Sequence, residues 1–271
     1  MLLSTEELQR RIAGQRWTAH NIRLDADCTT IPGEPDFLET DLRLKAILRI
    51  LDMLFGANLG GVRVADLGCL EGGFSLALAQ RGAEVLGVEA RHRNIEKATV
   101  LKDHFGLRNL KFQTADVKDF APDAGGQFDA VLALGILYHL DQPAQWLRRV
   151  AAATRRVLIL DTHFAPTEDA DLSLLDPRLK VLGPLETQEA EGFLVEGRWY
   201  PEFAEDTDPE DQLWASYSNS SSFWLTKDSL ITSVWRAGFP LVLEQHDYYS
   251  VSNYGLFNDT YPRCMLIGIK S

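Results

Sequence analysis

The sequence has few cysteines and no long apolar run. Its three cysteines, Cys28, Cys69 and Cys264, are odd in number and far apart. That spacing predicts neither a disulfide framework nor a metal site, and it favours a reducing, cytoplasmic location. No apolar stretch approaches the ~18 residues that span a bilayer, and the first residues, MLLSTEELQRRIAG, reach charged side chains too early for a signal peptide. Ser4 and Glu7 instead have the spacing of a capping box, which predicts a short helix.

The sequence also lacks an excess of basic residues. Its net charge is -12, and the segment 165–215 holds fourteen acids against three bases, or -11 of that total. The rest of the chain is nearly neutral and shows no basic footprint for nucleic acid. Nucleic acid is therefore not the expected partner, although a local basic patch could still serve RNA.

Periodic apolar residues are abundant and predict an α/β fold. A helix is expected over 37–56, ending at Gly56. Strands are then expected at 61–68, 84–90, 110–116, 128–137 and 155–164, with helices at 72–82, 93–106 and 143–154 between them. Such alternation predicts a parallel sheet with helices on both faces. A helix over 226–239, capped by Thr226, precedes two strands, at 240–249 and 263–271, expected as an antiparallel pair at the sheet edge.

The glycine-rich turn VADLGCLEGGFS, residues 64–75, follows the first of these strands. Ligands of doubly wound sheets bind at the carboxyl ends of such strands. A dinucleotide site needs G-x-G-x-x-G, yet Leu70 replaces the second glycine, and Glu71 would repel a phosphate. The turn therefore predicts a nucleotide-like ligand without a pyrophosphate, although Gly68, Gly72 and Gly73 would suit any tight strand-to-helix turn.

Several motifs in order resemble the class I S-adenosylmethionine-dependent methyltransferases over residues 37–164 and 223–271. Asp66, Gly68 and Gly72 match the first motif, and Leu70 departs from the glycine that many members have. Glu89 matches the acid that holds the ribose hydroxyls, and Asp116 the residue near the adenine. The resemblance implies a Rossmann-like, mostly parallel seven-stranded sheet and S-adenosylmethionine as cofactor, with S-adenosylhomocysteine as product. The cofactor contacts it implies are Asp66, Gly68, Cys69, Leu70, Gly72, Glu89, Ala90, Asp116, Val117, Leu134 and Gly135.

The methyl acceptor is expected near the loop GILYHLDQP, residues 135–143. If the acceptor must lose a proton, His139 is the candidate base, with packing or loop capping as its alternative role. Tyr138 and His163 are further candidate acceptor residues. In the lead-in, Trp17 and His20 could cover the cofactor, or could simply pack against the sheet edge.

The expected organisation is a lead-in over 1–36, a methyltransferase core over 37–164 and 223–271, and a partly irregular acidic insertion over 165–222. That insertion follows the fifth strand and is a candidate lid. The expected function is methyl transfer to a small-molecule acceptor by in-line displacement. Two alternatives stay open: a tRNA wobble-uridine-modifying transferase, whose loop resembles GILYHLDQP, and a non-catalytic cofactor-binding subunit. The sequence predicts neither the acceptor atom nor the oligomeric state.

Overall fold

The computed structural model of the chain describes residues 5–25, 28–122, 125–168, 181–190, 192–203, 207–247 and 262–271. The chain divides into two compact units, Met1–Val117 and Lys118–Ser271. Ser4, the predicted capping residue, lies outside the described residues, but the helix it was expected to begin is present as α1. No helix of the described residues is long and apolar enough to cross a membrane.

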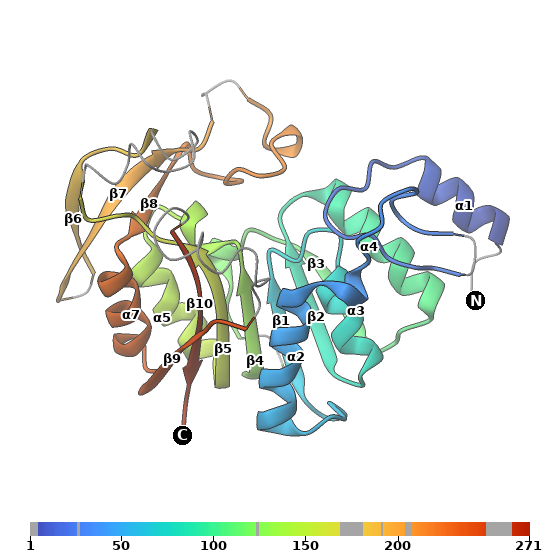
Figure 1. The fold of residues 1–271 in the computed structure, drawn as a ribbon, viewed down its shortest axis with the longest axis horizontal. Coiled ribbons are helices and arrows are strands. Elements are labelled where there is room, and N and C mark those ends of the chain that lie inside the picture. Colours follow the sequence, from blue (N-terminus) through green and yellow to red (C-terminus); the bar gives the residue numbers. More distant parts are fainter. Residues whose placement is uncertain are drawn as a thin grey trace. The chain divides into compact units, whose positions relative to one another are not determined.

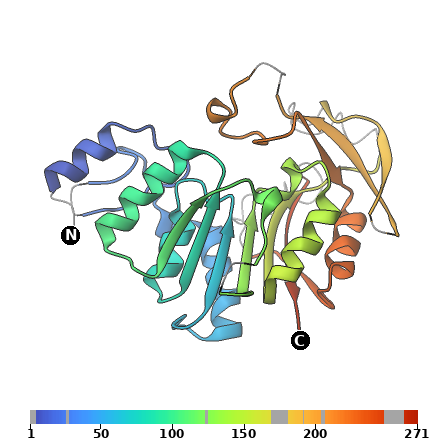
Figure 2. The same cartoon turned by 180° about the vertical axis from the view of Figure 1, so that it is seen from behind.

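Within its described residues, the first unit contains three parallel strands and four α-helices. The strands have the order β3-β2-β1. Helices α3 and α4 pack on this sheet. α3 contacts β2 and α4, and α4 contacts β2 and β3. Figures 1 and 2 show α1 alongside α4. The elements are α1 (Thr5–Ala13), η1 (Leu38–Thr40), α2 (Leu42–Phe55), β1 (Arg63–Leu67), α3 (Gly73–Gln80), β2 (Glu84–Glu89), α4 (His92–Phe105), β3 (Leu110–Thr114) and η2 (Val117–Asp119), the last of which continues into the second unit.

The ends of α2 and α4 follow from local side-chain chemistry. The prediction that the first long helix begins near residue 37 was wrong, because the side chain of Asp41 accepts hydrogen bonds from the backbone N–H groups of Arg43 and Leu44. An aspartate in this position caps a helix and starts it at the next residue. Gly56, with φ of 86°, ends α2 as predicted, and Gly106, in the left-handed conformation, ends α4.

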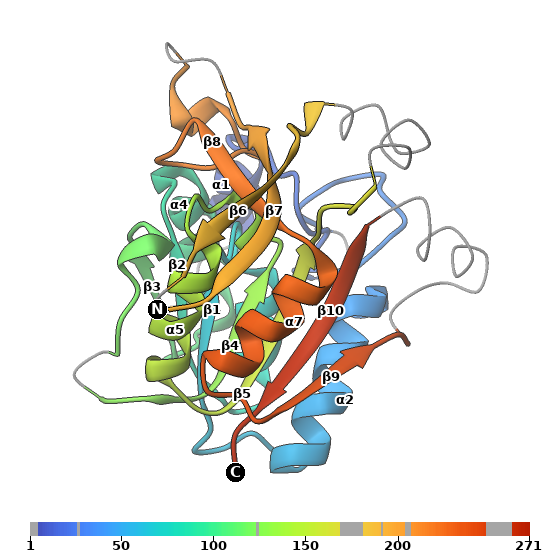
Figure 3. The same cartoon turned by 90° about the vertical axis from the view of Figure 1, so that its left-hand side faces the viewer.

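Among the residues described for the second unit are four further strands of the main sheet, in the order β4-β5-β10-β9. β4 is parallel to β5, whereas β10 is antiparallel to both β5 and β9. The predicted α/β class, with seven main strands and an antiparallel terminal pair, is confirmed. Figure 3 shows α7 beside β9 and β10. The elements are β4 (Phe128–Leu134), η3 (Leu137–His139), α5 (Pro143–Ala153), β5 (Thr154–His163), α7 (Lys227–Arg236), β9 (Leu241–Gln245) and β10 (Arg263–Ile269).

The acidic insertion forms a small antiparallel sheet, so the prediction that it is partly irregular was incomplete. β6 (Leu185–Glu189), β7 (Leu194–Pro201) and β8 (Ser221–Leu225) pair in that order, and η5 (Pro209–Asp211) lies between β7 and β8. β8 runs directly into α7, whose first turn is capped by Thr226 as predicted. One of the few bases here, Arg198, is 1% exposed and donates to three backbone carbonyl groups. These bonds compensate the burial of its charge.

Candidate functional site

The turn between β1 and α3 is built on left-handed backbone. Gly68, Leu70 and Gly72 have φ of 68°, 49° and 78°. A Cβ atom on Gly72 would lie 2.8 Å from Cζ of Phe112, so a larger residue does not fit there. Among the described residues, Leu70 is the only non-glycine with positive φ. Such backbone costs a residue with a Cβ atom about 1–2 kcal/mol. Leucine instead of glycine at position 70 therefore leaves the backbone of the turn locally strained.

Asp66 connects the end of β1 to the first turn of α3. It is 2% exposed and accepts a hydrogen bond from Oγ of Ser75 at 2.6 Å. Burial raises the pKa of this carboxyl group to about 6. The neighbouring Cys69 is also buried, and burial raises the pKa of its thiol well above the usual value. Such a thiol is inert, so Cys69 contributes volume and backbone to the turn.

Glu89 connects the end of β2 to the same turn. It is 3% exposed, and its two oxygens accept hydrogen bonds from the backbone N–H of Leu70 at 3.1 Å and of Arg91 at 2.8 Å. Burial raises the pKa of Glu89, while these hydrogen bonds oppose the rise. The carboxylate thus lies beside the glycine turn, as a cofactor-binding acid there would have to. Its contact with a ribose stays a prediction.

Ala90 and Asp116 follow neighbouring strands at the same edge of the sheet. Glu89 of β2 is in register with Thr114 of parallel β3, and the N–H of Ala115 donates to the carbonyl of Glu89 at 3.1 Å. Ala90 and Asp116 come immediately after these paired residues. Val117 is buried and begins η2. The first unit therefore brings these three predicted contacts to the strand ends that the turn also occupies.

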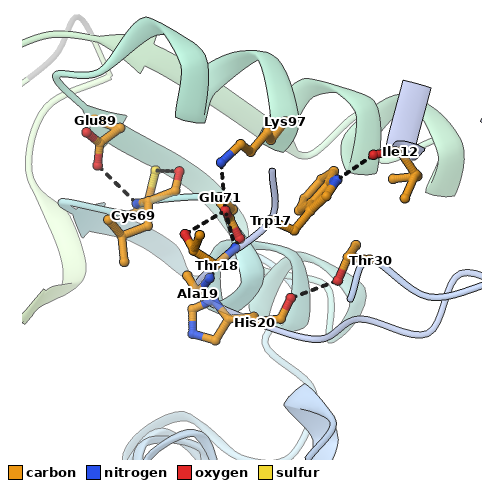
Figure 4. A network of polar contacts seen from close by, with 11 residues as sticks. Ile12, Trp17, Thr18, Ala19, His20, Thr30, Cys69, Glu71, Glu89 and Lys97 are labelled. Atoms are coloured by element: carbon orange, nitrogen blue, oxygen red, sulfur yellow. Dashed lines mark hydrogen bonds and ion pairs between the residues drawn. The ribbon is translucent and has the colours of Figure 1, made fainter. Parts of the chain in front are cut away.

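Glu71 ties the lead-in to the glycine turn (Figure 4). Its side chain is fully buried. One oxygen accepts from the backbone N–H of Thr18 at 2.8 Å and from Nζ of Lys97 at 2.8 Å, and the other accepts from the N–H of Ala19 at 3.0 Å. The hydroxyl of Thr18 adds a contact at 3.2 Å. Every part of this carboxylate is therefore engaged within the protein.

His20 lies over the start of α3, whereas the ring nitrogen of Trp17 bonds back to the preceding helix, α1. A Cβ atom on Gly73 would lie 2.6 Å from Nδ1 of His20, and the His20 and Phe74 ring centroids are 4.7 Å apart. Burial lowers the pKa of His20 to about 4, so its ring is neutral at pH 7. Trp17 is also buried, and its Nε1 donates to the carbonyl of Ile12 at 3.2 Å. His20 therefore contacts the start of α3, and Trp17 is bonded to α1.

In the second unit, Leu134 ends β4 and Gly135 follows with φ of 74°. The N–H of Gly135 donates to the carbonyl of Asp161 on β5 at 2.7 Å. The side chain of Asp161 is fully buried and accepts two hydrogen bonds from Arg263 of β10, both at 2.8 Å. This two-point ion pair fixes the strand ends from which the loop carrying His139 emerges.

His139 is held at two points by the acidic insertion. Its Nδ1 lies 3.0 Å from both carboxylate oxygens of Glu202, a residue that also accepts from the N–H of Ser216 at 2.9 Å. The side-chain amide of Asn219 donates to the carbonyl of His139 at 3.0 Å. The carboxylate favours a proton on Nδ1, which leaves Nε2 as the acceptor. Among the described residues, Nε2 of His139 has no hydrogen-bond partner.

Tyr138 and His163 belong to an aromatic cluster of the second unit. The centroid of Tyr138 lies 4.2 Å from that of His139 and 4.7 Å from that of His163. His163 in turn stacks on Trp224 at 5.1 Å, and Trp224 stacks on Tyr200. Burial lowers the pKa of His163 to about 3, and its Nδ1 lies 3.2 Å from the carbonyl of Pro262. His163 is thus neutral at pH 7, whereas His139 is paired with the carboxylate of Glu202.

Sequence reasoning missed four residues of this arrangement. Lys97 and Glu71 are 26 positions apart and Glu202 and His139 are 63 positions apart, so no local spacing connects them. Asn219 was likewise not singled out. For Glu71 the signal was present but was taken only as an argument against phosphate. In the described ranges, no group of three or more His, Cys, Asp or Glu side chains could hold a metal ion.

Part of this chain is similar to known methyltransferases. Residues 64–158 match a family model described as a methyltransferase domain. The ubiquinone biosynthesis O-methyltransferase of Psychrobacter arcticus is 36% identical over 88 residues, which are 32% of this chain and 34% of the relative. The chain therefore matches about a third of the length of that curated relative.

Two solved structures share the fold. The N-terminal domain of EvdMO1, crystallised in the presence of S-adenosylhomocysteine and D-fucose, has a TM-score of 0.72 at 24% identity, covering 100% of this chain and 98% of that one. Magnesium protoporphyrin IX methyltransferase from Synechocystis, with bound S-adenosylhomocysteine, has a TM-score of 0.51 at 20% identity, covering 98% and 94%. The family match identifies a methyltransferase domain over residues 64–158, and the two solved structures show that the chain shares their fold.

Proposed function

We propose that the chain catalyses methyl transfer from S-adenosylmethionine to a hydroxyl oxygen of a small-molecule acceptor, with His139 as the general base. The observation that carries the proposal is the contact of 3.0 Å between Nδ1 of His139 and Glu202. A carboxylate on Nδ1 fixes the orientation of the ring and stabilises the imidazolium that forms when Nε2 takes a proton.

The first unit supplies a turn that fits the cofactor. Its left-handed backbone admits close approach of a ligand, and Glu89 offers a carboxylate of the kind that binds a ribose diol. The cofactor supplies a methyl group on a cationic sulfur, and the sulfur leaves as a neutral thioether. The acids Asp66, Glu89 and Asp116 are compatible with such a cation, whereas a pyrophosphate would be repelled.

In the reaction, the protein orients the acceptor and removes its proton. The acceptor oxygen forms the new bond to carbon, and its proton passes to Nε2 of His139. Because the carbon is already activated, alignment of the oxygen contributes much of the rate enhancement. The names of the relatives support oxygen as the acceptor atom, since they include an O-methyltransferase, and EvdMO1 was crystallised with a sugar.

The charges of the second unit favour a neutral acceptor and the unmodified cofactor. A carboxylated cofactor, as in the wobble-uridine enzymes, would need a cationic partner. Arg263 is engaged by Asp161, and Arg198 donates to three backbone carbonyl groups. Both arginines are therefore committed to the fold. Neither is then available to the carboxylate of a modified cofactor. The acceptor we propose is a hydroxyl compound such as a sugar or a phenol.

The test combines calorimetry with a methyl-transfer assay. The purified chain is titrated with S-adenosylhomocysteine, then incubated with isotopically labelled S-adenosylmethionine and a panel of deoxysugar glycosides and catechols. We expect transfer to a hydroxyl compound, and a loss of at least about 100-fold in turnover for His139→Gln with unchanged cofactor affinity.

A matched control is His92→Gln, because His92 is an exposed histidine that lies 3.5 Å from Glu96. It should leave turnover and affinity at the wild-type level. Full turnover of His139→Gln would remove the histidine from catalysis. Cofactor binding without transfer to any acceptor of the panel would favour the non-catalytic alternative.

A further inference from the structure

Residues 17–24 of the lead-in, here called the N-terminal strap, are fixed to the glycine turn. We propose that Glu71 and Lys97 are positioning residues that hold the N-terminal strap against the turn, and that the strap is part of the cofactor-binding site. The inference rests on the proposed function, because it takes the turn to be where the cofactor binds. It adds a segment outside the matched family region, which spans residues 64–158.

The first argument is the way in which Glu71 binds the strap. Its carboxylate accepts the backbone N–H groups of two successive residues, Thr18 and Ala19, and so specifies the backbone rather than particular side chains. Lys97 of α4 neutralises the buried charge at 2.8 Å, and its own side chain is only 10% exposed. Burying both ions is costly unless their hydrogen bonds are satisfied, as they are here. The site is thus built for docking of the strap.

The second argument is that the strap is anchored at both ends, with His20 between the anchors. At the far end, Nε2 of His104 on α4 donates to the carbonyl of Leu24 at 2.9 Å. Inside the strap, the carbonyl of His20 accepts from the hydroxyl of Thr30 at 2.8 Å. These contacts press the His20 ring onto Gly73 at the start of α3. No bulkier residue than glycine could sit beneath that ring.

The third argument is that strap and cofactor residues share one turn. The N–H of Leu70 is bound by Glu89, and the next residue is Glu71. A shift of Glu71 therefore moves Leu70, which is already strained, and disturbs its bond to Glu89. If the cofactor needs this turn geometry, strap docking and cofactor binding must stabilise each other, because coupling between two binding events is reciprocal.

The experiment measures that coupling in both directions on the full chain. Amide hydrogen exchange of residues 17–24 is followed with and without S-adenosylhomocysteine, and calorimetry gives the affinity. In the wild type, S-adenosylhomocysteine should slow exchange in the strap. In Glu71→Gln, exchange should be faster and affinity about ten-fold weaker, which corresponds to one charge-assisted hydrogen bond.

The matched control is Asp52→Asn, which weakens another carboxylate contact of the same unit, that of Asp52 with Arg81 at 2.6 Å. It should change neither strap exchange nor affinity. Should Glu71→Gln fail to fold, the double variant Glu71→Met/Lys97→Met serves instead, since apolar residues of similar volume often replace a buried pair without loss of stability.

The outcomes separate the strap from the proposed function. A wild type that does not bind S-adenosylhomocysteine contradicts the proposed function itself. If the wild type binds it, but strap exchange is the same with and without ligand, the coupling is absent and only the strap inference fails. The same holds if a folded variant with a loosened strap binds with wild-type affinity.

Discussion

Each unit of the molecule contains a buried carboxylate that joins distant parts of the chain, but with different partners. Glu71 in the first unit is fully buried and binds a lysine and two backbone N–H groups. Glu202 in the second unit has a side chain that is 1% exposed and binds the ring of His139. A lysine keeps its proton near neutral pH, whereas a histidine can exchange one. The same type of side chain thus anchors a buried segment in one unit and, in our proposal, supports the catalytic histidine in the other.

The largest expected effect comes from removing the lysine partner of Glu71, the carboxylate of the first unit. Lys97→Met leaves Glu71 as a buried charge without its counter-ion, so the free energy of unfolding should fall by about 3–5 kcal/mol. Urea denaturation measures it. As a control, Lys227→Met removes a lysine that is 40% exposed from its contact with Glu244 and should cost at most about 1 kcal/mol. A similar small loss for Lys97→Met would show that Glu71 does not need the cation.

A second effect concerns His20 and His163, two histidines whose pKa values are lowered by burial. Burial lowers the pKa of His20 to about 4 and of His163 to about 3, both below the ordinary value near 6.5. As pH falls below 6.5, the unfolded chain takes up protons that the native chain does not, so stability declines until the native pKa is reached. Each histidine should contribute about 2–3 kcal/mol of this loss by pH 4.

Unfolding experiments between pH 7 and pH 4 on His20→Asn and His163→Asn check this expectation. Each variant should show a shallower decline of stability than the wild type in this range. Parallel curves for variant and wild type would mean that the histidine titrates alike in the folded and unfolded states.

The smallest expected effect comes from removing the charge of Glu202, the carboxylate of the second unit. Glu202→Gln keeps a hydrogen-bond acceptor beside His139 but removes the negative charge that would stabilise the imidazolium. Turnover should fall about ten-fold, with the affinity for S-adenosylhomocysteine unchanged. Glu96→Gln, at the exposed pair with His92, is the matched control. If Glu202→Gln lowered cofactor affinity instead of turnover, the role of Glu202 would be structural.

Much of the fold was predictable because it depends on local signals. Alternating apolar segments predicted the seven main strands, and Gly56, Gly106 and Thr226 marked helix ends correctly. The start of α2 was misplaced because apolar periodicity outweighed the cap at Asp41. None of the three strands of the small sheet, β6, β7 and β8, was predicted. The sequence of β6, LETQE at Leu185–Glu189, is short and mostly exposed. Its pairing with β7 supplies what its own sequence does not signal.

Residues of the candidate site were predictable only where they belong to a local sequence motif. The turn, Glu89 and His139 stand in motifs of fixed order, and their cofactor and catalytic roles stay predictions. The partners of Glu71 and of His139 depend instead on how distant segments fold together, which residue spacing does not encode. Leu70 shares features of both groups, the motif residues and the residues whose role depends on the fold. Its departure from glycine was visible in the sequence, but its positive φ is a property of the folded turn.

The chain segments that enter and leave the acidic insertion are hydrogen-bonded to each other. The N–H of Ala165 donates to the carbonyl of Leu225 at 2.8 Å, and Ala165 forms a bridge with Thr226, so the chain leaves the sheet and returns to it at one place. A segment closed in this way can change length at small entropic cost while β5 and α7 keep their ends. Glu202 and Asn219 both lie within it. The insertion can therefore be exchanged as one unit. Recombination that replaced it would replace both residues that hold His139, and the sequence of the glycine turn would stay the same.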